Sequence, residues 1–119
     1  MIDPKDREMF IEKAQGEVIE SNETHLKIAF PNNYGISIVR FTATERYPLP
    51  FLSVWLEAEG FGSYGADEGL YEIAVLSLPD GGYAIDYSTP ITNDVVGYLT
   101  PEQVCEYIER IKQLPKYKP

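Results

Sequence analysis

The order of hydrophobic and polar positions divides the chain into two helical ends and a long extended stretch between them. Residues 4–15 carry apolar side chains at helical spacing, behind a capping Asp3 and a proline suited to the first helical position. From residue 17 the apolar positions alternate, as half-buried strands require. The helical period returns after Thr100, which opens the capping box T-P-E-Q.

Turn-forming residues divide the extended stretch into about six strands. These are predicted at 18–20, 26–30, 36–41, 51–58, 70–78 and 83–87, with a tight turn at 79–82 and a short apolar segment at 95–99. No segment between 17 and 99 has the length of a crossover helix, so the strands are expected to pair antiparallel. We therefore predict one α+β domain over residues 1–119. Its antiparallel meander sheet of about five to six strands carries the N-terminal and C-terminal helices on one face.

Charge is distributed unevenly along the chain. The net charge is -9, and residues 47–109, called the acidic half below, contain eleven Asp and Glu residues but no Lys, Arg or His. Direct nucleic-acid binding requires Lys and Arg to neutralise phosphates, so the acidic half is not expected to bind nucleic acid. Such a surface suits a basic protein partner, although acidic balance also serves solubility alone.

A glycine-rich loop invites comparison with nucleotide-binding sites. Residues 60–65, G-F-G-S-Y-G, fit the G-x-G-x-x-G template. That template requires a helix after the loop, whereas strand residues follow in this chain, and Asp67 and Glu68 place negative charge where a pyrophosphate would lie. We therefore predict a flexible turn between two strands, with Phe61 and Tyr64 lifted toward a partner.

Few groups are available for catalysis or metal binding. The chain has one histidine, His25, and one cysteine, Cys105, and a cysteine beside an apolar stripe is more often packed than nucleophilic. Asp86 and Asp94, with nearby hydroxyls, leave open a divalent-cation or paired-carboxylate site, but their spacing matches no familiar cation loop. We predict no catalytic, cofactor or metal residues.

Tyrosine is abundant in the acidic half. Each ring can be ordinary strand packing, yet tyrosine also supplies rigid contact area at protein interfaces. The predicted partner-binding residues combine aromatic and acidic side chains near the glycine loop and the later turns: Phe61, Tyr64, Asp67, Glu68, Tyr83, Asp86, Tyr87 and Asp94.

Two segments resemble small uncharacterised proteins encoded by bacteriophages and prophages. They are G-S-Y-G-A-D-E-G-L-Y-E-I-A-V-L at 62–76 and D-Y-S-T-P-I-T-N-D-V-V-G-Y-L-T-P-E-Q-V at 86–104. The resemblance covers roughly the last half of the chain and brings no known activity or catalytic residue. It implies a mobile element in a bacterial cytoplasm. Small acidic phage proteins of that sort often bind and block a host protein, as anti-defence inhibitors such as anti-CRISPRs do.

These observations predict a non-enzymatic, cofactor-free module that binds a basic host protein, including one that itself binds nucleic acid. One cysteine, the absence of a signal-like start and the absence of a long apolar run predict a soluble cytoplasmic protein without membrane contact. The alternatives are a small ligand- or divalent-metal-binding domain that uses Asp86 and Asp94, and a virion structural or assembly protein. The oligomeric state is left open.

Overall fold

The computed structural model describes residues 1–42, 62–78, 83–86, 88–92 and 95–118. The predicted strand at 51–58 and the predicted turn at 79–82 lie outside these residues. The elements described are α1 (Pro4–Ala14), β1 (Glu17–Ser21), β2 (His25–Ala29), β3 (Tyr34–Val39), the 3₁₀ turn η1 (Ala66–Glu68), β4 (Tyr71–Ser77), β5 (Ala84–Ile85), β6 (Val96–Leu99) and α4 (Pro101–Lys112).

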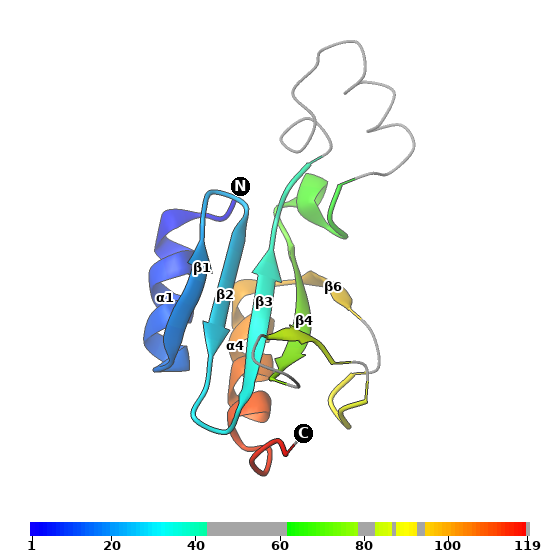
Figure 1. The fold of residues 1–119 in the computed structure, drawn as a ribbon. Helices are drawn as coiled ribbons and strands as arrows, with labels where there is room; N and C mark the ends of the chain where they lie inside the picture. Colours follow the sequence, from blue (N-terminus) through cyan, green and yellow to red (C-terminus); the bar gives the residue numbers. More distant parts are fainter. Residues whose placement is uncertain (43–61, 79–82, 87, 93–94, 119) are drawn as a thin grey trace.

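The strands form one antiparallel sheet in the order β1-β2-β3-β4-β5, and β6 returns to pair with β4. β5 and β6 therefore share one edge of β4: β5 pairs with Leu76 and Ser77, and β6 pairs with Tyr71 and Ile73. Figure 1 shows both helices on the far side of the sheet, where α1 contacts β2 and α4 contacts β3, β4 and β6. The predicted α+β fold, with both terminal helices on one face, is confirmed.

Both helices begin at the predicted caps. The Asp3 carboxylate accepts a hydrogen bond from the amide of Lys5 at 2.8 Å. At α4, the Thr100 hydroxyl accepts from the Gln103 amide at 3.2 Å, and the Gln103 side chain accepts from the Thr100 amide at 2.9 Å. These bonds satisfy amides that would otherwise lack a partner within the helix.

We expect Thr100→Ala to lower the free energy of unfolding by about 1 kcal/mol, because the Gln103 amide loses its acceptor. For a chain of this size, the melting temperature should fall by roughly 3–6 °C. Circular dichroism during heating measures the shift. Thr100→Ser keeps the hydroxyl and is the matched control, so equal destabilisation by both substitutions would contradict the capping role.

The end of α1 shows why a glycine follows it. The residue in the left-handed region is Gln15, with φ of 49°, and not Gly16 as the usual stop signal suggests. Gly16 is instead a point of close approach: a Cβ there would lie 2.3 Å from the carbonyl oxygen of Ala29. The glycine thus lets the start of β1 lie against β2.

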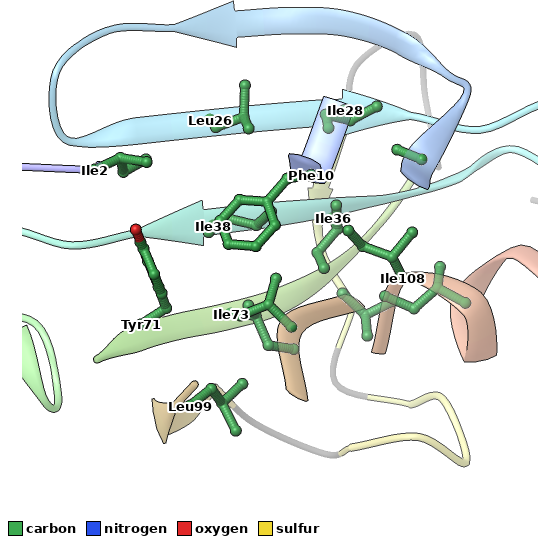
Figure 2. Close-up of a cluster of buried hydrophobic side chains, with 14 of the residues drawn as sticks. Ile2, Phe10, Leu26, Ile28, Ile36, Ile38, Tyr71, Ile73, Leu99 and Ile108 are labelled. Carbon is green, nitrogen blue, oxygen red and sulfur yellow. The ribbon is translucent and has the colours of Figure 1, made fainter. Parts of the chain in front are cut away.

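The core lies between the sheet and the two helices. Phe10 of α1 and Ile108 of α4 are fully buried, and β2, β3 and β4 contribute the apolar side chains of their helix-facing side. The Phe10 ring meets the Tyr71 ring edge to face, with centroids 5.2 Å apart. Figure 2 shows the cluster formed by Ile2, Phe10, Leu26, Ile28, Ile36, Ile38, Tyr71, Ile73, Leu99 and Ile108.

Tyr71 links the sheet to the start of α1. Its ring is fully buried, and its hydroxyl donates to the Asp6 carboxylate at 2.6 Å and accepts from the Asp3 amide at 3.2 Å. The Arg40 guanidinium lies 4.6 Å from the centre of the ring and donates to the carbonyls of Met1 and Gly69. Burial first, and then the hydrogen bond to Asp6, raise the pKa of Tyr71 far above its usual value.

Candidate functional site

The described part of the glycine-rich loop, from residue 62 on, forms a compact turn that leads into β4. Gly65 and Gly69, at the two ends of η1, have φ of 94° and 74°, a region that glycine enters without steric cost. The buried Ser63 hydroxyl accepts from the Phe41 amide at 3.0 Å, and the Ser63 amide donates to the Phe41 carbonyl at 2.8 Å. After Gly65 the described residues place only the single 3₁₀ turn η1, which carries Asp67 and Glu68, and then strand β4, so no α-helix N-terminus follows the glycines to hold a phosphate.

Two exposed tyrosines meet at this turn, and we call Tyr64 and Tyr98 the tyrosine pair. Their exposed fractions are 56% and 57%. The Tyr98 amide donates to the Tyr64 carbonyl at 3.1 Å, which joins the turn to β6. Gly97 permits this approach, because a Cβ there would lie 2.3 Å from the Cβ of Tyr64.

Tyr98 is a functional candidate that the sequence prediction missed. Its φ of 58° is uncommon for an aromatic residue, and the pairing of β6 with β4 is irregular between Tyr71 and Ile73. Such irregular pairing redirects side chains at the rim of a sheet. In the sequence, only Gly97 marks the position, and a single glycine does not reveal which residue it approaches.

Three acidic residues follow Tyr64 on η1 and β4. Asp67 and Glu68 are exposed on η1, and the Glu72 carboxylate accepts from the Tyr64 amide at 3.1 Å. A cation, Arg40, lies at the end of the turn, where its guanidinium donates to the Gly69 carbonyl at 2.9 Å. The predicted residues Tyr64, Asp67 and Glu68 thus lie together, with Glu72 and Tyr98 as additions.

The predicted residues Tyr83 and Asp86 lie at β5, toward the other end of β4. The Asp86 amide donates to the Val75 carbonyl at 2.8 Å, two to four residues, or about 7–14 Å, along β4 from the residues that pair with β6. Burial alone would raise the pKa of Asp86, but hydrogen bonds from Ser88 and Ser77 outweigh it and hold the pKa below its usual value. These two residues form a second group, separate from the tyrosine pair. The remaining predicted residues, Phe61, Tyr87 and Asp94, lie outside the described residues.

Basic residues are absent from one group of neighbouring elements. η1, β4, β5 and β6 contain no Lys, Arg or His. The Lys and Arg residues of the described chain lie elsewhere: Lys5, Arg7, Lys13, Lys27, Arg40, Arg110, Lys112, Lys116 and Lys118. Because β5 and β6 both pair with β4 on the edge away from β3, these three strands of the acidic half lie together at one edge of the sheet (Figure 1).

The only histidine and the only cysteine of the sequence lie on opposite faces of the sheet. His25 stacks on Phe41, with ring centroids 5.5 Å apart, and lines a hollow on the face away from the helices. Cys105 lies on α4, where it packs against the core, and burial raises the pKa of its thiol. A Cys-His catalytic pair is therefore excluded by the position of the sheet between them.

The hollow on the face away from the helices has a volume of about 410 Å³. The described residues that line it include Lys27, Ser37, Val39, Glu72, Leu76 and Ile85. Asp86, one of the two carboxylates of the ligand hypothesis, is not among them, because its side chain is engaged with Ser88 at 2.6 Å. Across the described ranges, no three His, Cys, Asp or Glu side chains gather closely enough to hold a metal ion.

Comparisons of the chain with known protein families, curated proteins and solved structures find no match. The described helices are all too short or too polar to cross a bilayer.

Proposed function

We propose that this chain is a non-enzymatic protein-binding module whose acidic, tyrosine-bearing sheet and glycine loop dock on a basic protein. The observation that carries the proposal is that η1, β4, β5 and β6 are neighbours, carry Asp67, Glu68 and Glu72, and are free of Lys, Arg and His. A surface of one sign attracts a partner of the opposite sign over long range and orients it before contact.

We further propose that the partner is a host protein that binds nucleic acid, and that docking blocks it. Support comes from the resemblance of residues 62–76 and 86–104 to small phage and prophage proteins. Carboxylates of η1 and β4 can occupy positions that phosphates would take on a basic protein. An anti-defence inhibitor is one role of this kind.

The proposal predicts binding that weakens with salt. Immobilised protein should retain a basic protein from a bacterial lysate, to be identified by mass spectrometry and purified. The rate constant for association of the purified partner with this protein should fall at least about tenfold between about 50 and about 300 mM salt, because salt screens charges on exposed surfaces. Surface plasmon resonance with the purified partner measures this rate.

A matched pair of variants separates the effect of charge at η1 from the effect of the net charge of the protein. Asp67→Asn/Glu68→Gln removes two carboxylates from η1, whereas Glu8→Gln/Glu12→Gln removes two exposed carboxylates from α1. We expect the first variant to slow association about threefold to tenfold and the second to have a much smaller effect. Retention that is equally strong at high salt, or equal losses in both variants, would refute docking through the acidic half.

A further inference from the structure

We propose that the tyrosine pair binds arginine side chains of the partner, with Asp67, Glu68 and Glu72 as the neighbouring anions. This inference rests on the proposed function and assigns its recognition chemistry. It concerns a surface of the described chain that is solvent-exposed, aromatic and bordered by carboxylates.

The tyrosine pair is held in place by its backbone. Tyr64 donates its amide to Glu72 and accepts at its carbonyl from Tyr98, so both hydrogen-bonding groups of its backbone are used. The space at Gly97 admits no side chain, and a Cβ at Gly65 would lie 3.0 Å from the Cα of Tyr98. A rigid backbone leaves little conformational freedom to lose when a ligand covers the rings.

The rest of the chain already pairs arginine with tyrosine. Arg40 lies over the Tyr71 ring at 4.6 Å, and Arg110 lies over the Tyr107 ring at 5.2 Å. Within the described part of the chain, no Lys or Arg lies over the ring of Tyr64 or Tyr98. As far as the described residues are concerned, these two rings are therefore open to a cation from another molecule.

Arginine suits this surface better than lysine does. A guanidinium is planar, stacks on an aromatic ring and can still donate in its own plane to a carboxylate. Lysine presents a compact, strongly hydrated charge, which gains from the carboxylates but less from the rings. The preference for arginine over lysine is thus the property that distinguishes the tyrosine pair from simple attraction between opposite charges.

The test compares fluorescently labelled octa-arginine and octa-lysine peptides by anisotropy titration at one salt concentration. The unmodified protein should bind octa-arginine about fivefold or more tightly than octa-lysine. In Tyr64→Leu/Tyr98→Leu the two affinities should become nearly equal, because the side chains stay bulky but lose their aromatic faces. Tyr64→Phe/Tyr98→Phe keeps the rings and should keep the preference.

Two further variants complete the design. Asp67→Asn/Glu68→Gln should weaken both peptides about equally, and Glu8→Gln/Glu12→Gln on α1, outside the acidic half, controls for net charge. A thermal melt of each variant confirms folding. Equal or undetectable binding of both peptides, or an arginine preference that survives the leucine substitutions, overturns the role of the tyrosine pair. Neither result alters the salt-dependent capture described above, which tests the proposed function separately.

Discussion

Phe10→Ala is expected to lower the free energy of unfolding by about 3–5 kcal/mol, a large fraction of the stability of a domain of this size. Phe10 is fully buried between the sheet and α1, and its ring meets Tyr71 edge to face. Truncation removes both the apolar transfer energy and the contacts that line the resulting cavity. Urea denaturation followed by circular dichroism measures the change.

An exposed aromatic residue provides the control for Phe10. Tyr64→Ala removes a ring of similar size that is 56% exposed, and its effect on stability should stay within about 0.5 kcal/mol. A loss of less than about 1 kcal/mol in Phe10→Ala would contradict the packing of α1 against the sheet. Such a result would leave the tyrosine pair untouched, because its hydrogen bonds involve the glycine turn, β4 and β6.

Alkaline pH is expected to destabilise the fold through Tyr71. Its folded pKa is raised by burial and by the hydrogen bond to Asp6, whereas the unfolded chain ionises near pH 10. A raised folded pKa contributes stability that is complete below pH 10 and is lost as the pH rises toward the folded value. The loss should approach about 1.4 kcal/mol per pH unit from this residue.

Tyr71→Phe tests the origin of that pH dependence. The variant should be about 1–2 kcal/mol less stable at neutral pH, because the Asp6 and Asp3 hydrogen bonds are lost. Above pH 10 its stability should fall less steeply than that of the unmodified protein. Some slope should remain, since burial also raises the pKa of Tyr34 and Tyr83. Urea titrations at several pH values measure the free energy of unfolding of each protein, with the exposed Tyr64→Phe as control. If that free energy fell with pH equally steeply in Tyr71→Phe and in the unmodified protein, Tyr71 would not be the source of the pH dependence.

The sequence predicts those features of the structure that depend only on residues close together in the chain. The caps at Asp3 and Thr100, and the hairpin around residues 21–24, are predictable because a few adjacent residues satisfy one another's hydrogen bonds. The α+β class follows from the same local patterns. β5 is shorter than the predicted strand at 83–87, since its described pairing with β4 covers only Ala84 and Ile85.

Contacts between distant segments cannot be predicted in the same way. The return of β6 to β4 and the meeting of Tyr98 with Tyr64 depend on residues 34 positions apart in the sequence. Alternation predicts that a segment is extended but does not name its partner strand. For that reason the predicted site contains Tyr64, Asp67 and Glu68 but omits Tyr98 and Glu72.

The irregular pairing in β1 has a consequence for how any partner can approach. β1 lies at the outside of the sheet, and its register with β2 shifts between Val18 and Glu20. A bulge in an outer strand interrupts the regular spacing of outward amides and carbonyls, which discourages a foreign strand from extending the sheet. A partner is therefore not expected to bind by adding a strand to β1. In concentrated solution, copies of this chain should likewise resist edge-to-edge association through β1.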